Sequence, residues 1–188
     1  PAGGQNVAVW RGTNLQIKGG FEAAGNINRD PKIFVSYIFP GSDPTPISGN
    51  PVFRRGFYTS GLTAASILSG FTIAGGNIGG GGKGGGMFNQ NSSLTISDCV
   101  FESNEAQYGG GIYNENSSPA MSNLILSSNF AVVSGGAVYN QNGTPAITNS
   151  TFDSNRANGW LDFTAFDGGG AVYNDKSSAA ITNSTPAG

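Results

Sequence analysis

Histidine is absent from this 188-residue chain, and cysteine occurs only once, at position 99. Without histidine, one chain cannot build a Ser-His-Asp triad, a Cys-His pair or a histidine-ligated zinc site. A single cysteine cannot form an internal disulfide, so other interactions must hold the fold together. We interpret Cys99, which falls in a strand-like run, as a small buried apolar residue.

Charged residues are also scarce. Asp, Glu, Lys and Arg make up 11% of the chain, and the net charge is −2, whereas a typical domain has about 25% charged residues. There is no basic stripe that could follow phosphates, which argues against nucleic-acid binding. No apolar run approaches the roughly 18 residues of a membrane span. The first residues lack signal-peptide features, so we expect a secreted chain whose signal peptide has been removed.

Glycine is abundant, at 31 residues of 188, and many glycines open the copies of one repeated motif. The motif is written four times, starting at Gly84, Gly109, Gly135 and Gly168. An aromatic-Asn pair recurs in each copy, and its asparagines at positions 89, 114, 140 and 174 stand 25, 26 and 34 residues apart. A regular period of this size indicates a stacked repeat architecture. The long third step contains an insertion at residues 156–168.

The composition of the repeat favours a β-solenoid over a helical one. Glycine inside a helix costs about 1 kcal/mol relative to alanine, whereas short alternating runs such as residues 146–152 indicate strands bounded by turns. A unit of about 25 residues has room for three short strands and three bends, which is one rung of a parallel β-helix. We predict one all-β domain over residues 1–188, a right-handed parallel β-helix of about seven or eight rungs. Residues 1–62 form irregular early rungs with side loops, and residues 63–188 form regular repeats with Gly/Asn-rich corners.

Equivalent residues of successive rungs should stack about 4.8 Å apart. The expected apolar columns are Ile96, Met121, Ile147 and Ile181, and Phe101, Leu126 and Phe152. The expected aromatic column is Phe88, Tyr113, Tyr139 and Tyr173. A fourth column, Asn104, Asn129 and Asn155, can pass carboxamide hydrogen bonds from rung to rung and tolerates the left-handed backbone of a sharp corner. We therefore predict a structural role for these asparagines.

Two short patterns in the repeats resemble a known group of proteins. A GGA-(I/L/V)-type segment occurs at residues 135–138 and 169–172, and an F-x-x-N segment occurs at residues 101–104 and 152–155. Together they resemble the repeats of polymorphic outer-membrane proteins and related pectate-lyase-like β-helix surface proteins of bacteria. The first two copies lack the alanine, and Leu126 replaces the phenylalanine in the second. The resemblance implies a right-handed parallel β-helix at a bacterial cell surface, and it carries no catalytic residues.

The insertion at residues 156–168 is rich in aromatic residues. Trp160, Phe163 and Phe166 either fold back over the side of the solenoid or form a contact platform for a neighbouring subunit or a sugar. An incidental Ca²⁺ site at Asp162 and Asp167 is left open; no other cofactor is expected.

Five N-x-(S/T) triplets recur with the repeat, at Asn91, Asn116, Asn142, Asn149 and Asn183. In a eukaryotic secretory route they would be potential glycosylation acceptors. In a bacterial surface protein, which the resemblance implies, they are corner residues only.

These patterns favour a non-enzymatic, extracellular structural protein of adhesin type. The last copy leaves its rung unfinished, and an uncapped sheet edge is a template for another chain, so we expect copies to stack into a cell-surface filament. The alternative is a carbohydrate-binding or polysaccharide-cleaving β-helix, a lyase or glycosidase, which needs paired carboxylates or carboxylates with a cation and a base. The acidic residues fall into two sequence groups, Asp98, Glu102, Glu105 and Glu115, and Asp153, Asp162, Asp167 and Asp175; we interpret them as surface charges. Ice binding ranks last, because only Thr148 and Thr182 align.

Overall fold

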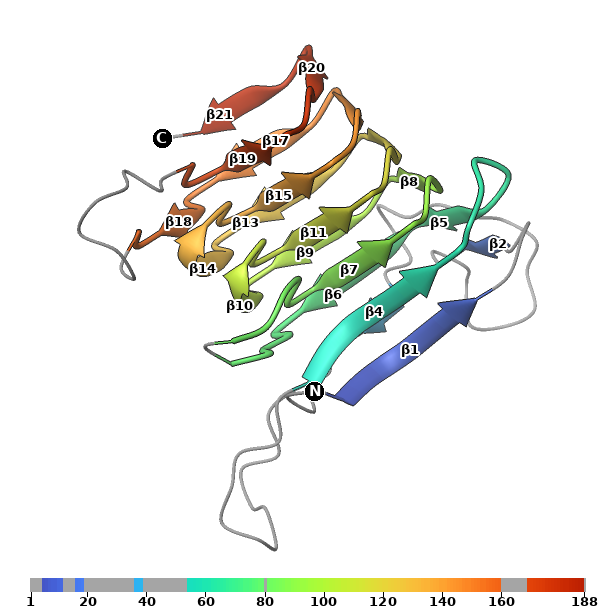
Figure 1. Ribbon diagram of the computed structural model, residues 1–188, viewed down its shortest axis with the longest axis horizontal. Helices are drawn as coiled ribbons and strands as arrows, with labels where there is room; N and C mark the ends of the chain where they lie inside the picture. The colour runs from blue at the N-terminus through green and yellow to red at the C-terminus, as the bar shows by residue number, and fades with distance from the viewer. Residues whose placement is uncertain are drawn as a thin grey trace, which may run out of the picture.

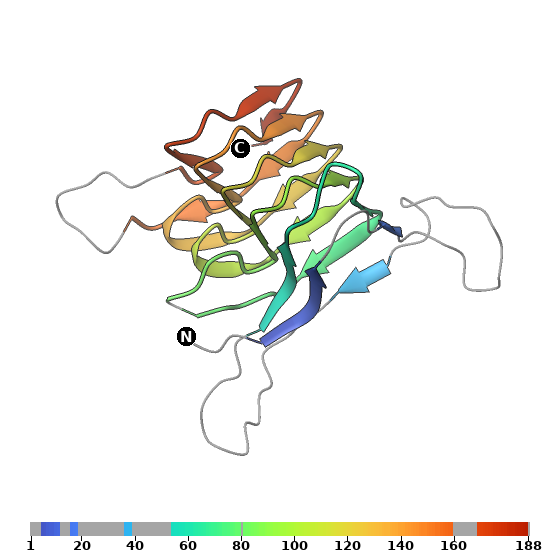
Figure 2. The ribbon, with the colours of Figure 1, turned by 45° about the vertical axis from the view of Figure 1, so that its right-hand side comes forward.

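The computed structural model describes residues 5–11, 16–18, 36–38, 54–79, 81–159 and 169–187. Every regular element among these residues is a β-strand, and all strand pairs are parallel. The chain coils into a parallel β-solenoid whose successive turns lie side by side in chain order (Figures 1 and 2). The predicted all-β, parallel solenoid architecture is confirmed. A helix suited to crossing a membrane is not found in this part of the chain.

Three long sheets and one short sheet form the walls of the solenoid. The first sheet consists of β1 (Gln5–Arg11), β4 (Arg54–Ser60), β7 (Met87–Gln90), β11 (Ile112–Glu115), β15 (Val138–Gln141) and β19 (Val172–Asp175). The second consists of β2 (Gln16–Lys18), β5 (Ile67–Ser69), β8 (Thr95–Ser97), β12 (Ala120–Ser122), β16 (Ala146–Thr148) and β20 (Ala180–Thr182). The third consists of β3 (Ser36–Ile38), β6 (Phe71–Ala74), β9 (Val100–Glu102), β13 (Ile125–Ser127), β17 (Thr151–Asp153) and β21 (Thr185–Ala187). The short sheet consists of β10 (Glu105–Tyr108), β14 (Phe130–Ser134) and β18 (Arg156–Ala157).

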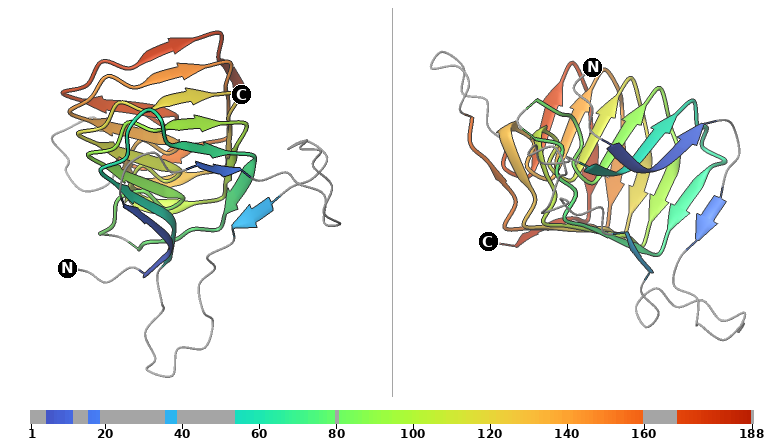
Figure 3. Two further views of the ribbon diagram at one scale, coloured as in Figure 1. Left: turned by 90° about the vertical axis from the view of Figure 1, so that its right-hand side faces the viewer. Right: turned by 90° about the horizontal axis from the view of Figure 1, so that it is seen from below.

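The chain makes about four turns from β4 to β19 along the first sheet, and β1, β2 and β3 pair with β4, β5 and β6 before them. The described residues do not support the seven or eight rungs expected from the sequence, an estimate that divided almost the whole chain by the repeat period. The predicted unit of three strands also needs correction, because the short sheet adds a fourth strand to the regular turns (Figure 3).

The interior of the solenoid contains the predicted apolar columns. Ile96, Met121 and Ile147 pair in register along the second sheet, and all three are buried. Phe101, Leu126 and Phe152 do the same along the third sheet. Because side chains of a strand alternate between its two faces, only every second residue of each short strand enters this core.

Sharp corners between the sheets are made by residues with a left-handed backbone. After strands of the first sheet these are Asn91, Asn116, Asn142 and Lys176; after the second, Asp98, Asn123, Asn149 and Asn183; after the third, Ser103, Ser128 and Ser154. Asn and Asp tolerate this conformation because their short polar side chains can hydrogen-bond locally. All five asparagines of the N-x-(S/T) triplets are exposed corner residues of this kind.

The predicted asparagine column forms a buried ladder inside the solenoid. Asn104 Nδ2 donates to Asn129 Oδ1 at 2.9 Å, and Asn129 Nδ2 donates to Asn155 Oδ1 at 2.9 Å. Asn129 Oδ1 also accepts from the backbone N–H of Asn104 at 3.1 Å, and its amide donates to the Phe101 carbonyl at 2.9 Å. The ladder therefore joins rungs and also satisfies buried backbone groups at the turn.

A second ladder, which was not predicted from the sequence, follows the aromatic column and is buried except at its exposed end, Asn174. Its carboxamides donate to one another from Asn89 to Asn114 at 2.7 Å, from Asn114 to Asn140 at 2.8 Å and from Asn140 to Asn174 at 2.9 Å. The Thr59 hydroxyl continues it by donating to Asn89 Oδ1 at 2.6 Å. Both ladders replace water with a fixed set of hydrogen bonds, so they select one register between rungs.

We expect Asn129→Ala to lower the free energy of unfolding by about 1–3 kcal/mol, because it leaves buried hydrogen-bonding groups without partners. Asn158→Ala is the matched control, since Asn158 is exposed. Chemical denaturation of both variants measures the difference. Equal unfolding midpoints would contradict a stabilising role for the ladder.

Glycine is required at the start of the first three motifs for two reasons, as Gly109 shows. Its φ is +63°, and a Cβ there would lie 2.4 Å from the Ile112 carbonyl oxygen. Gly109→Ala should therefore destabilise the fold more than Gly61→Ala, where φ is +72° but no atom lies within 4 Å. The conformation alone costs about 1–2 kcal/mol. Gly81→Ala, which has neither constraint, should leave the free energy of unfolding nearly unchanged in chemical denaturation. A Gly81→Ala variant less stable than Gly109→Ala would refute this explanation.

Candidate functional site

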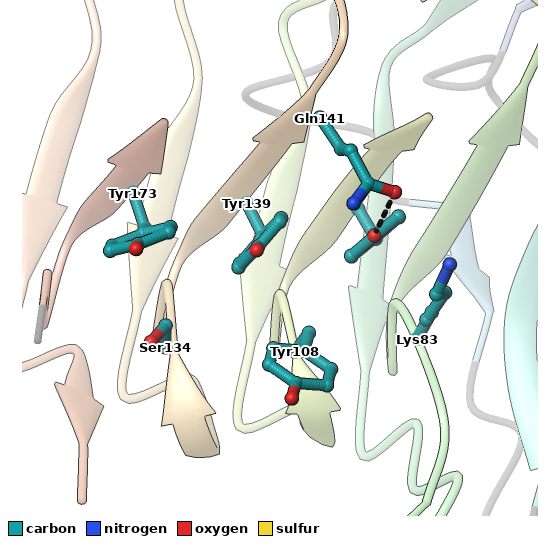
Figure 4. Close-up of a pocket in the computed structure, with 7 residues that line it drawn as sticks. Lys83, Tyr108, Ser134, Tyr139, Gln141 and Tyr173 are labelled. Carbon is teal, nitrogen blue, oxygen red and sulfur yellow. Dashed lines mark hydrogen bonds between the residues drawn. The ribbon is translucent and has the colours of Figure 1, made fainter. Parts of the chain in front are cut away.

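A groove of about 260 Å³ lies on the outer surface of the first sheet, beside the short sheet (Figure 4). Its lining residues are Lys83, Tyr108, Tyr113, Ser134, Tyr139, Gln141 and Tyr173. Strand alternation explains why tyrosines line it: in β11, Ile112 and Asn114 are buried inside, so Tyr113 and Glu115 project from the opposite face.

The predicted aromatic column forms the floor of the groove. The Phe88 and Tyr113 rings meet edge to face, with centroids 5.4 Å apart. Tyr113 and Tyr139 are stacked at 4.9 Å with an interplanar angle of 9°, and Tyr139 and Tyr173 at 5.0 Å with 30°. The predicted stack is therefore confirmed for the three tyrosines, whereas Phe88 continues the column with an edge-to-face contact. Because ring faces meet one another, the rings present mainly edges and hydroxyls to a ligand.

A second column of side chains covers the rings from the short-sheet side. Lys83 pairs with Tyr108 as a parallel β-bridge, and Tyr108 pairs with Ser134 between β10 and β14. Lys83 Nζ lies 4.8 Å from the centroid of the Tyr113 ring. The Tyr108 ring meets the Tyr139 ring edge to face at 5.3 Å. We call Lys83, Tyr108 and Ser134 the covering column.

The outward polar residues two positions after each ring form a third column. Gln90 Nε2 donates to Glu115 Oε2 at 2.8 Å, and Gln141 Nε2 donates to Asp175 Oδ2 at 2.8 Å. Glu115 Oε1 accepts from Lys83 Nζ at 2.6 Å, which forms an ion pair. The Tyr113 hydroxyl donates to Gln141 Oε1 at 2.9 Å (Figure 4). We call Gln90, Glu115, Gln141 and Asp175 the polar column.

The hydroxyls of Tyr113 and Tyr139 stay protonated well above neutral pH. Burial raises the pKa of Tyr113 above its ordinary value, and the Glu115 carboxylate raises it further. Burial likewise raises the pKa of Tyr139, with a further contribution from Asp175. Both phenols are therefore neutral hydrogen-bonding groups.

Arg55 holds the backbone of the segment that carries Lys83. Its Nη2 donates to the Lys83 carbonyl at 2.6 Å, and its Nε donates to the Gly84 carbonyl at 2.8 Å. The guanidinium lies 5.2 Å from the centroid of the Phe88 ring, and burial lowers the pKa of Arg55 to about 10. These contacts fix Lys83 at one end of the groove.

Among the described residues, the others singled out from the sequence do not meet at one site. Trp160, Phe163, Phe166, Asp162 and Asp167 lie outside the described residues, so the aromatic platform and the Ca²⁺ site remain predictions. The first acidic group divides among different walls, because Glu102 is on the third sheet, Glu105 on the short sheet and Glu115 on the first. The described part of the chain contains no group of three or more potential metal ligands. Cys99 is buried, as predicted.

Sequence reasoning missed the covering column, although a signal for it exists. Lys83, Tyr108 and Ser134 each come immediately before the left-handed glycine of a motif, at Gly84, Gly109 and Gly135. Because these three side chains differ in size and charge, the position does not stand out as part of the repeat.

One comparison with known proteins gives a match. The family model described as "Right handed beta helix region" matches residues 47–185, which is most of the chain. No curated protein and no solved structure matches the chain. The family match agrees with the solenoid and with the predicted right-handed coil.

Alkaline pH should destabilise the fold through the buried phenols. In the unfolded chain tyrosine ionises near a pKa of about 10, whereas the raised pKa values keep the folded phenols protonated. Above that pH the folded state binds more protons, so the free energy of unfolding falls as pH rises. Tyr139→Phe should reduce this loss, measured by urea unfolding at about pH 8 and about pH 11. An unchanged pH dependence in the variant would argue against a buried, protonated Tyr139.

Proposed function

The chain belongs to the right-handed β-helix family, and on this premise we propose that it is a non-enzymatic, extracellular structural protein of adhesin type. Its solenoid acts as a rod at a cell surface and pairs end to end with copies of itself. The resemblance of its GGA-(I/L/V) and F-x-x-N segments to polymorphic outer-membrane repeats supports the surface location and a bacterial source.

The ladders inside the solenoid support a structural role. Asn104, Asn114, Asn129 and Asn140 are all buried. Each carboxamide is hydrogen-bonded to its equivalent in the next rung. These polar groups hold rungs together along the axis, which is the direction in which a rod carries load.

For the 188 residues of this sequence, self-association is supported by the edge formed by β19, β20 and β21. Among the described residues, each of these strands pairs on one side only. Ile181 of β20 is 44% exposed, whereas its equivalent Ile147 in the preceding rung is fully buried. A strand from a copy would supply backbone partners and cover Ile181 as β20 covers Ile147. Such a head-to-tail contact does not close, so it produces filaments.

Carbohydrate binding is the second candidate, and the groove is the observation that favours it. Tyrosine hydroxyls, the Gln141 amide and aromatic ring edges line a cleft on the side of the rod. Neutral hydroxyls and amides together with apolar ring edges suit the polar and apolar faces of a sugar.

Ile181→Lys should prevent end-to-end assembly, because a partner strand would bury an unpaired ammonium. Ile125→Lys is the matched control: Ile125 is equally exposed, at 47%, but lies on the side of the rod in β13. Sedimentation velocity and negative-stain microscopy of the purified chain and both variants measure the assembly.

We expect the parent chain and Ile125→Lys to form rods of increasing length with concentration, and Ile181→Lys to remain a single unit. A parent chain that stays monomeric at high concentration would refute self-association. Equal loss of assembly in both variants would place the contact on the sides of the rod instead.

A further inference from the structure

The groove repeats one local arrangement of three side chains. From rung to rung, the covering residue and the polar-column residue change together. Each arrangement combines a tyrosine ring, the covering residue beside it and the polar-column residue two positions after the ring. In the first, Lys83 covers Tyr113, and the polar-column residue is Glu115. Lys83 Nζ contacts the ring face and the Glu115 carboxylate together, so an ammonium is held by a cation–π contact and an ion pair.

In the second arrangement both partners are neutral. Tyr108 covers Tyr139 with its ring, and the polar-column residue is Gln141. The covering residue is therefore cationic where the polar column holds a carboxylate, and uncharged where it holds an amide. This correspondence agrees with electrostatics, because the partly exposed Lys83 ammonium forms an ion pair with the Glu115 carboxylate.

The third arrangement has the carboxylate but no cation in the covering column. The ring is Tyr173, the polar-column residue is Asp175, and the covering residue is Ser134, which lines the same groove as Tyr173 (Figure 4). Asp175 Oδ2 accepts from Gln141 in the same way that Glu115 Oε2 accepts from Gln90. For Asp175 Oδ1, the position that Lys83 fills at Glu115, the described residues provide no hydrogen bond.

Ser134 itself indicates a ligand at this point. Its side chain is 1% exposed, and its hydroxyl has no hydrogen-bond partner among the described residues. A buried hydroxyl without a partner is destabilising, and Ser134 lines the groove. The serine side chain is also shorter than those of Lys83 and Tyr108, which occupy the equivalent positions of the covering column.

We propose that the groove binds a primary ammonium group between Tyr173, Asp175 and Ser134. The ammonium donates to Asp175 Oδ1 and to the Ser134 hydroxyl oxygen and lies against the Tyr173 ring, as Lys83 Nζ does at Glu115 and Tyr113. The site takes the ammonium of a lysine side chain, an amino sugar or a small amine. This inference does not depend on the proposed structural function, and its test reads binding instead of assembly.

The direct test titrates the parent chain with butylammonium, followed by the NMR signals of the tyrosine rings and of the amine. Butanol is the neutral control with the same carbon chain. We expect saturable binding of butylammonium that shifts the Tyr173 ring signals, and no comparable binding of butanol. Nα-acetyl-lysine amide and glucosamine in parallel titrations distinguish a peptide source from an amino-sugar source.

Three variants test the geometry. Asp175→Asn should weaken butylammonium binding by about tenfold, which is the factor expected for one lost charge-assisted contact. Ser134→Lys supplies an ammonium from the chain itself and should abolish binding. Glu102→Gln removes an exposed carboxylate from the third sheet and should leave binding unchanged.

Circular dichroism shows whether each variant is folded, and Ser134→Ala replaces Ser134→Lys if the larger residue disrupts the fold. Ser134→Ala should weaken binding several-fold without lowering stability, because the hydroxyl makes no hydrogen bond within the described chain. Equal binding of butanol and butylammonium, or an Asp175→Asn variant that binds like the parent, would overturn the proposal. Binding of p-cresol in place of the amine would also overturn the proposal. It would mean that the site takes a neutral ring, like the Tyr108 ring that contacts Tyr139.

Discussion

The hydrogen bond between equivalent carboxamides of neighbouring rungs is the interaction on which the rest of this structure depends. Parallel strands fix the spacing between rungs at about 4.8 Å, but they do not by themselves fix which residue stands above which. A buried asparagine that donates to its equivalent does so, because a slip of one residue would leave its donor and acceptor unpaired away from water. The Asn104–Asn129–Asn155 ladder fixes one wall of the solenoid, and the Asn89–Asn114–Asn140 ladder fixes another.

This register also determines the outer surface. Because Asn114 points inward, its neighbours Tyr113 and Glu115 point outward. The same holds for the equivalent residues of the other turns that keep the motif. The same ladder therefore aligns the tyrosine rings, the polar column and, through β10 and β14, the covering column. Substitutions on the outside vary the chemistry while the inside keeps the geometry constant. The groove is accordingly a series of equivalent positions occupied by different residues. Comparing its rungs shows that the third has a carboxylate, Asp175, in the polar column but a serine, Ser134, in the covering column.

Much of the fold was predictable because the repeat places like residues at like positions. One position of the repeat is apolar in each copy, as Ile96, Met121 and Ile147 show, and another is always asparagine, at Asn104, Asn129 and Asn155. The length of the repeat and the residues that stack in each column could therefore be predicted from the sequence. The short sheet was not predicted, because its strands begin with Glu105, Phe130 and Arg156, which share neither size nor polarity. The groove was missed for a related reason: it requires residues such as Tyr108 and Tyr139, far apart in the repeat, to meet across two sheets. That meeting depends on the angle at each corner, which no local pattern encodes.

Hydrogen exchange of the asparagine side-chain amides, followed by NMR, tests the central claim most directly. If the carboxamide ladders hold the rungs in register, the Nδ2 hydrogens of Asn104, Asn114, Asn129 and Asn140 should exchange only through unfolding of the rungs, far more slowly than those of the exposed Asn116 and Asn142. Asn116 and Asn142 also stand in a column, with amide contacts at 3.2–3.3 Å, so they separate the effect of burial from that of stacking alone. Equally fast exchange of all six side chains would show that the ladders do not hold the solenoid together.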